Sequence, residues 1–157
     1  MMDNSQELDK VDERIHKILA KFDEIKAIDD KIRGIMDKVP PALSNLKHRI
    51  EQNKPYFMNP VLSERNHKLS FSFYSVKFEI TAHINLNTSP EQITQGVLRT
   101  SVYDESQKSF VHNPAYDMTI DENGKIDKEF SNDDWAEHYF NKVIWDFYNK
   151  GTEITFG

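Results

Sequence analysis

Residues 8–25 carry apolar side chains at alternating intervals of three and four residues, and apolar positions at helical spacing continue to residue 39, which predicts an amphipathic helix with a hydrophobic seam. Such a seam is typical of helices that pack on a second helix in a coiled coil. A helix over residues 8–39 would span roughly 48 Å at 1.5 Å per residue, whereas a compact domain made from the remaining chain would be about 35 Å across. We therefore expect another chain to cover part of the seam. Its residues are Leu8, Val11, Ile15, Ile18, Phe22 and Ile25.

The apolar pattern changes after Ile25. A strict repeat would place Asp29 in the seam, while Ile28 and Ile35 offer a neighbouring apolar row. Two successive three-residue steps at this point form a stammer, which disturbs a regular coiled coil, and Gly34 costs about 1 kcal/mol relative to alanine in a helix. We therefore expect the first half of the helix to meet another chain and the second half to dock on its own domain.

We expect Pro40 and Pro41 to end this helix, because neither can donate a backbone hydrogen bond. Pro41 can then begin a second, shorter helix that runs from Ala42 to about Asn53. The apolar stripe of this helix consists of Leu43, Leu46 and Ile50.

From Lys68 the apolar period becomes two, which indicates β-strands. The alternation changes parity across Tyr74 and Ser75, so a tight turn or a bulge must absorb one residue. Because no Gly, Asn or Asp occurs there, a bulge within one long bent strand that reaches Leu86 is favoured. Three more strands are predicted, over residues 96–103, 109–112 and 115–121.

The dipeptide Asn123–Gly124 is a strong hairpin signal. A three-residue loop that ends at Gly124, with this glycine in a left-handed conformation, would pair Ile120 with Ile126. The same register would pair Tyr116 with Phe130.

The last predicted helix begins at Ser131, whose hydroxyl would cap it, and ends near Gly151. Its broad aromatic face predicts packing across one face of the sheet. Trp145 lies off this face and is therefore the better candidate for a contact surface or the mouth of a cavity. The residues of the face are Trp135, Tyr139, Phe140, Val143, Ile144 and Phe147.

These elements predict an α+β fold with a long N-terminal helix, a short second helix, an antiparallel sheet of four to six strands that includes a bent or bulged long strand, and a C-terminal helix packed on the sheet. Residues 1–40 would form the long amphipathic helix, used for oligomerisation and partly docked on its own domain. Residues 41–157 would form the α+β domain.

Charge and composition narrow the class of protein. The net charge is −6, and residues 111–157 alone hold ten acids against four bases, a balance that disfavours nucleic-acid binding. No apolar run approaches the length that crosses a bilayer, so no membrane contact is expected. The chain has no cysteine and its first residues do not resemble a signal peptide, so a cytoplasmic location is expected.

No catalytic motif stands out, and no pair of histidines has the spacing of metal ligands, so neither a metal nor another cofactor is expected. The best catalytic pairs that can be assembled are His112 with Asp117 and His138 with Asp134. His138 lies four residues after Asp134 on the same helix face, and such a pair is explained more simply by an ordinary ion pair.

The pattern therefore favours a non-enzymatic interaction protein that self-associates through its N-terminal helix, most simply as a dimer. Its acidic C-terminal part could contact another protein. The alternative is a small-molecule-binding protein or an enzyme with an apolar pocket between the sheet and the last helix. The residues that would line this pocket are Phe73, Phe78, His112, Tyr116, Trp135, His138 and Tyr139.

Overall fold

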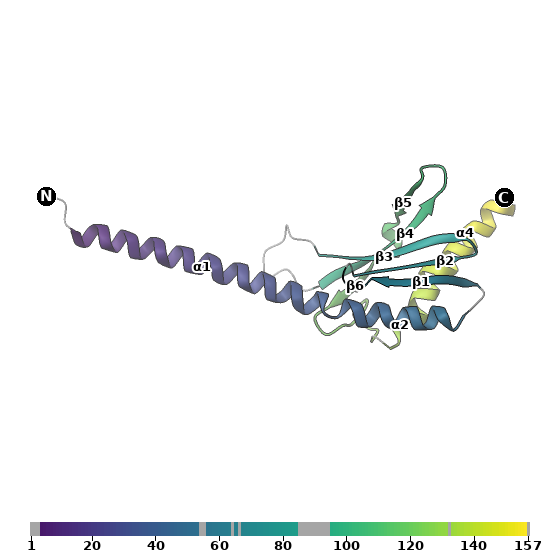
Figure 1. The fold of residues 1–157 in the computed structure, drawn as a ribbon, viewed down its shortest axis with the longest axis horizontal. Coiled ribbons are helices and arrows are strands. Elements are labelled where there is room, and N and C mark those ends of the chain that lie inside the picture. Colours follow the sequence, from purple (N-terminus) through teal and green to yellow (C-terminus); the bar gives the residue numbers. More distant parts are fainter. Residues whose placement is uncertain are drawn as a thin grey trace.

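The structure is a computed structural model that describes residues 4–53, 56–63, 65, 67–84, 95–131 and 133–156. It has the predicted α+β architecture, with a long N-terminal helix that extends away from the sheet (Figure 1). The helices are α1 (Asn4–Met36), α2 (Val39–Glu51), α3 (Trp135–Tyr139) and α4 (Trp145–Phe156), and the strands are β1 (Phe57–Ser63), β2 (Lys68–Phe73), β3 (Val76–His83), β4 (Gln95–Asp104), β5 (Ser109–His112) and β6 (Met118–Asp121).

Helices α1 and α2 are separated by a two-residue break rather than by the proline pair itself. The last turn of α1 is closed by a hydrogen bond from the Asp37 amide to the Arg33 carbonyl oxygen (2.8 Å). Pro40 and Pro41 lie in the first turn of α2, where backbone N–H groups have no intrahelical partner and proline is tolerated. The second helix therefore begins three residues earlier than the sequence predicted.

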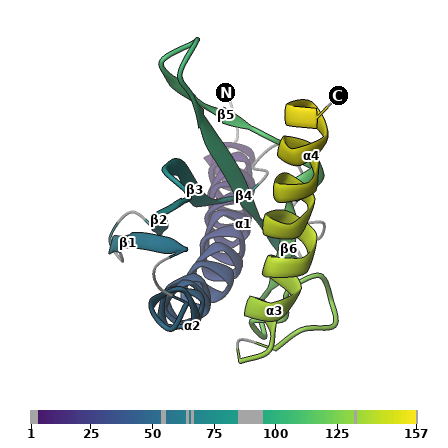
Figure 2. The ribbon, with the colours of Figure 1, turned by 90° about the vertical axis from the view of Figure 1, so that its right-hand side faces the viewer.

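The sheet is antiparallel and has the order β1-β2-β3-β4-β5, with β6 also paired to β4. The ten-residue strand β4 is long enough to pair with β6 through its first half and with β5 through its second half. Figure 2 shows the C-terminal helix running along one side of this sheet, with α2 beside it.

The prediction of one long strand through Tyr74 and Ser75 is wrong, because β2 and β3 form a tight hairpin in which Phe73 pairs with Val76. Both turn residues have left-handed backbone conformations, with φ of 47° and 71°. Primed turns of this kind match the twist of antiparallel strands, so the regular β2–β3 ladder and its paired aromatic side chains stabilise a turn that lacks glycine. The irregularity of the sheet occurs instead in β1, between Met58 and Val61.

In the segment after β6, the turn at Gly124 is predicted correctly, and the course of the chain after Ile126 is predicted wrongly. Gly124 has a φ of 78°, and Ile120 bridges Ile126, as expected. Phe130, however, also pairs with Ile126, and Tyr116 lies apart from it in the short 3₁₀ helix η2 (Pro114–Tyr116). The chain turns back at Asp127, whose amide and carboxylate both bond the backbone of Thr119 at 2.9 Å.

The C-terminal helix contains a π-helical segment, η3 (Phe140–Ile144), between α3 and α4. It begins at Trp135 instead of following Ser131 directly, because the Ser131 hydroxyl donates a hydrogen bond to the Asp134 carboxylate (3.0 Å) and does not cap an amide. It also continues past Gly151, where the sequence predicted its end.

One hydrophobic core joins α2, the inner face of the sheet and the C-terminal helix. Two buried polar contacts hold these layers together. The Trp135 indole N–H donates to the Ala42 carbonyl oxygen (2.9 Å), and the Tyr139 hydroxyl bonds the Thr100 hydroxyl (2.9 Å). Both contacts satisfy polar groups that burial would otherwise leave unpaired.

Candidate functional site

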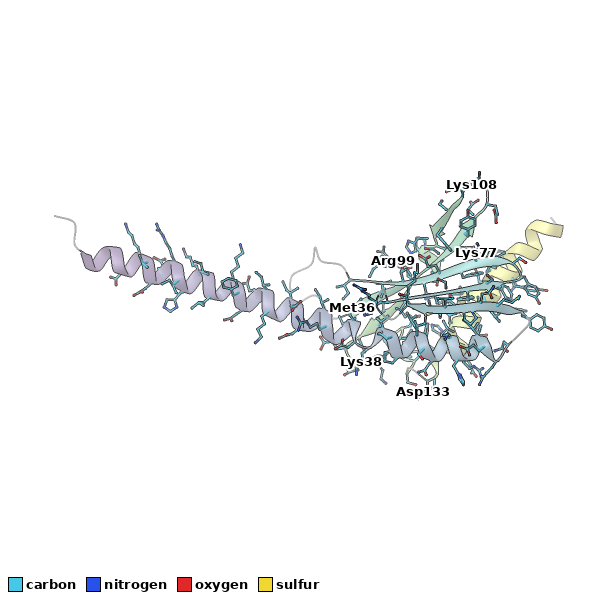
Figure 3. The ribbon with its side chains drawn as sticks, in the orientation of Figure 1. Met36, Lys38, Lys77, Arg99, Lys108 and Asp133 are labelled. Atoms are coloured by element: carbon cyan, nitrogen blue, oxygen red, sulfur yellow. The ribbon has the colours of Figure 1, made fainter. Side chains whose placement is uncertain are left out.

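The first part of α1 has a stripe of large apolar side chains that no other part of the described structure covers. This uncovered stripe is exposed by about half, and Figure 3 shows the side chains of this part of α1 standing clear of the sheet. The exposed fractions are 48% for Val11, 47% for Ile15, 55% for Ile18, 53% for Leu19, 62% for Phe22 and 54% for Ile25. Five of the six predicted seam residues therefore belong to the uncovered stripe, and the side chain of Leu8 lies outside the described part.

Few contacts support this part of α1 apart from its own backbone. Glu13 and Lys17 form an exposed pair one helical turn apart, with 3.8 Å between the charged atoms. Pairs of this kind contribute only a few tenths of a kcal/mol, and helices gain most of their stability by packing an apolar face. The stripe is thus the largest source of further stability that this helix could use.

The last part of α1 docks on the sheet. Ile35 is fully buried, and Ile28 and Met36 pack against the same core, with Met36 placed where the helix meets the sheet in Figure 3. The close approach depends on Gly96 in β4, because a Cβ atom there would lie 3.0 Å from Ile35 Cγ2. The uncovered stripe ends where this docking begins.

The positions that flank the predicted seam differ in charge on its two sides, and Leu19 of the uncovered stripe is one of these positions. Asp12, Leu19 and Lys26 follow one another at seven-residue intervals along one flank, and Arg14 and Lys21 do so along the other. Flanking positions of a helix pair decide which partner and which orientation are favoured.

A second surface feature is an open cleft of about 420 Å³ at the far end of the domain from the N-terminus. It lies between the end of α2, the β2–β3 turn and the C-terminal helix. Four half-exposed rings line this aromatic cleft. They are Tyr56, Tyr74, Trp145 and Tyr148, which are 54%, 58%, 61% and 47% exposed.

The rings of the aromatic cleft are arranged in two pairs. Tyr56 and Tyr74 have ring centroids 5.7 Å apart, and Trp145 stacks on Tyr148 at 5.9 Å. Trp145 is the residue that the sequence placed off the apolar face, and it now lines a cleft as a contact residue would. Exposed aromatic side chains are enriched at binding surfaces because they offer a large apolar area with few rotatable bonds.

The polar side chains of the aromatic cleft come from α2 and the π-helical segment. Arg49 approaches Glu137 with an exposed contact of 3.4 Å, and the Asn53 amide donates to the Arg49 carbonyl oxygen (2.7 Å). The π-helical segment supplies Asn141 together with two apolar lining residues. Among the described residues that line this cleft, none carries a carboxylate.

A larger open cleft, of about 610 Å³, lies between β3, β4, β5 and the C-terminal helix. His112 and Tyr116 line it. The Tyr116 hydroxyl donates to the Asp146 carboxylate (2.8 Å), and burial together with this bond raises the pKa of Tyr116 well above its usual value. His112 bonds Asp117 at 2.7 Å, so the predicted pair is confirmed.

The second predicted pair is wrong, because His138 bonds Asp127 (2.7 Å) and not Asp134. Lys142 reaches the same carboxylate oxygen of Asp127 at 3.2 Å, and the ring of Phe130 stacks on His138 with 4.0 Å between centroids. Asp134 instead accepts its bond from a neighbouring hydroxyl. Sequence spacing alone could not reveal Asp127, which reaches the helix only because the chain turns back there.

The Asp127 carboxyl is held in its ionised form. Burial alone would raise its pKa, but hydrogen bonds from His138, from the Thr119 amide and from Lys142 outweigh burial, so the pKa lies below its usual value. Because these donors reach both carboxylate oxygens, the cluster ties the turn to the C-terminal helix.

The seven residues predicted to line one pocket occupy different places. Phe78, Trp135 and Tyr139 are at most 1% exposed and fill the core. Phe73 lines the aromatic cleft, and the remaining three are the His112, Tyr116 and His138 side chains described above.

Within the described part of the chain, no group of three or more His, Asp and Glu side chains could hold a metal ion. None of its helices combines the length and the apolar character needed to cross a membrane. Comparisons with models of protein families, with curated proteins and with solved structures found no match to this chain. Inferences about function therefore rest on the uncovered stripe and the clefts of this chain itself.

Proposed function

We propose that this chain is a non-enzymatic interaction protein that self-associates through α1, most simply as a homodimer. The observation that carries the proposal is the uncovered stripe, whose six large apolar side chains are 47–62% exposed on one helix face. Monomeric soluble proteins rarely expose continuous apolar patches of more than a few hundred Å², and such patches mark interaction sites.

A second copy of this chain fits the stripe better than an unrelated surface does. The five seam residues of the stripe alternate between two apolar rows, as in helices that pack on a like helix. Two-fold pairing would cover both stripes at once and close the assembly. The exposed half of each side chain would then be buried in the interface. Full burial of such a side chain stabilises an assembly by about 1.5–3 kcal/mol.

The charges beside the stripe favour an antiparallel pair. In a parallel pair, Lys21 would face Lys26 of the partner subunit twice. In an antiparallel pair centred on Leu19, each flank meets the same flank of the partner, so Asp12 faces Lys26 of the partner subunit twice, and Leu19 meets its own copy. One contact between the two Lys21 side chains opposes this arrangement. The balance still favours antiparallel packing, because two attractions replace two repulsions.

The test of self-association is sedimentation equilibrium of the full chain at micromolar concentrations. The wild type should sediment as a dimer, and Ile18→Asp should sediment as a monomer, because its charge would be buried without a partner. Ala20→Asp is the matched control, since Ala20 lies on the opposite, exposed face of α1, and it should remain dimeric. A monomeric wild type would overturn the proposal.

The orientation has a test of its own, with the dimer dissociation constant as the readout. Lys26→Asp should weaken an antiparallel dimer, because it would then face Asp12 of the partner subunit, but it should tighten a parallel dimer by relieving the repulsion from Lys21. Combining Lys26→Asp with Asp12→Lys should restore antiparallel affinity. Tighter binding by the single variant would refute antiparallel packing and leave self-association intact.

A further inference from the structure

We propose that the aromatic cleft binds a proline-rich peptide segment of another protein in the polyproline II conformation, with an acidic residue beside the prolines. The elements that line this site, the end of α2, the β2–β3 turn and the C-terminal helix, lie at the opposite end of the molecule from the first part of α1 (Figure 1). The site is therefore separate from self-association and does not depend on it.

The first support is the exposed aromatic surface. Two ring pairs line the cleft: Tyr56 with Tyr74, from the residue before β1 and the β2–β3 turn, and Trp145 with Tyr148, from the C-terminal helix. Proline-rich segments dock between aromatic rings of this kind, because the pyrrolidine ring is apolar and the peptide is already extended before it binds.

The second support is the kind of hydrogen-bonding group that the cleft offers. Its polar side chains include tyrosine hydroxyls, the Trp145 indole N–H, Arg49 and asparagine amides, all of which can donate. A polyproline II segment has no internal hydrogen bonds, so its carbonyl oxygens are free to accept from these donors. A sugar would also bring many hydroxyl donors, and the described lining residues include no carboxylate to accept them.

Charge supports an acidic neighbour for the prolines. Arg49 is the one charged side chain among the described residues that line the cleft, in a chain whose net charge is −6. Its contact with Glu137 is exposed and 3.4 Å long, and exposed pairs of this kind contribute little. An acidic ligand residue could therefore take the place of Glu137 at small cost. A quaternary ammonium ligand, which aromatic cages also bind, would be repelled by Arg49.

The backbone of the C-terminal helix is irregular where it lines the cleft. Phe140, Asn141 and Ile144 all belong to the π-helical segment η3 and all line the cleft. Single π-helical turns within α-helices occur frequently at functional sites. A π-helical turn also rotates the residues that follow it around the helix axis relative to those of α3. This rotation helps to place the rings of Trp145 and Tyr148 at the cleft.

The experiment titrates the 157-residue chain with a synthetic decaproline peptide that carries one flanking aspartate. Binding is measured by calorimetry and by amide NMR. A glycine–serine peptide of the same length with the same aspartate is the peptide control. We expect saturable binding of the proline peptide alone, with shifts at the Trp145 indole and not at the indole of Trp135, which is fully buried.

Variants then locate the site. Trp145→Ala and Tyr74→Ala should each weaken binding at least about tenfold, as expected for aromatic hot spots. Phe110→Ala removes an exposed aromatic ring outside the cleft (39% exposed) and should leave affinity unchanged. Arg49→Gln should abolish the preference for the aspartate-bearing peptide over plain decaproline.

Three results would overturn the inference. These are equal binding of the proline and glycine–serine peptides, no shift at Trp145 with millimolar peptide, and binding of cellohexaose at this cleft in place of the peptide. Circular dichroism of each variant separates loss of binding from loss of the fold.

Discussion

Replacing Gly96 by alanine should destabilise the protein by about 1–2 kcal/mol, because it disturbs the docking of α1 on β4. The new Cβ would lie 3.0 Å from Ile35 Cγ2 and 3.3 Å from the His83 carbonyl oxygen. Ile35 is fully buried and the carbonyl belongs to a paired strand, so neither can move away freely. Overpacking of this kind costs about 1–3 kcal/mol, and removing a glycine from a strand returns roughly 0.5–1 kcal/mol.

Gly34→Ala, in α1 next to Ile35, is the matched control. There the new Cβ would lie 3.7 Å from Glu122 Cγ, which is an ordinary contact. The free energy of unfolding should therefore rise by about 0.5–1 kcal/mol, the gain expected when alanine replaces glycine inside a helix. Urea denaturation of both variants at one protein concentration measures the two changes. If Gly96→Ala were neutral or stabilising, the docking described for Ile35 would be refuted.

Two further substitutions test the segment after β6. Asp127→Asn should lower the free energy of unfolding by about 1.5–3 kcal/mol, the range for hydrogen bonds to a charged group. Because the pKa of Asp127 is lowered in the folded protein, its stabilisation is present above the unfolded value of about 3.9 and disappears as the pH falls through the folded value. The wild-type advantage in urea melts should thus vanish in acid, and an advantage that persisted there would contradict the ionic role. Gly124→Val should cost at least about 1 kcal/mol, since a β-branched residue resists a φ of 78°, and unchanged melting would refute the turn.

Periodicity predicted the elements that have one regular apolar face. The long helix, the stripe of α2 and strand β4 follow from spacing alone, because each places its apolar residues at the interval its backbone requires. The sequence also placed the change from partner contact to docking near Ile25, and Ile28, three residues further on, packs against the core. What covers the stripe stays a prediction of the sequence.

The failures occurred where contacts between elements override the preference of single residues. The turn at Tyr74 and Ser75 has no residue that favours positive φ, so local propensity pointed to a bulge, yet pairing along β2 and β3 imposes the turn. The partner of His138 was missed for the same reason, because Asp127 reaches the helix only after a second left-handed turn.

The aromatic cleft shows why a site can escape sequence analysis. Its rings come from a loop, a turn and a helix that are far apart in the chain, so no spacing connects them. A usable signal was nevertheless present. Tyr74 lies at the break in the strand alternation, and Trp145 lies off the apolar face of its helix. An aromatic residue outside the core pattern is a better indicator of a surface site than one within it.

Because of where the two proposed surfaces lie, pairing through α1 would increase the affinity of the assembly for a partner with two binding segments. The first part of α1 and the elements that line the aromatic cleft lie at opposite ends of the molecule (Figure 1), so pairing through α1 would leave the cleft open. An antiparallel dimer would then carry two clefts that face away from each other along the paired helices. A partner with two proline-rich segments and a spacer long enough to span them would bind the second cleft as an intramolecular event, with avidity set by the spacer. Weak single-site binding would therefore suffice for a stable assembly, provided that the helices stay paired.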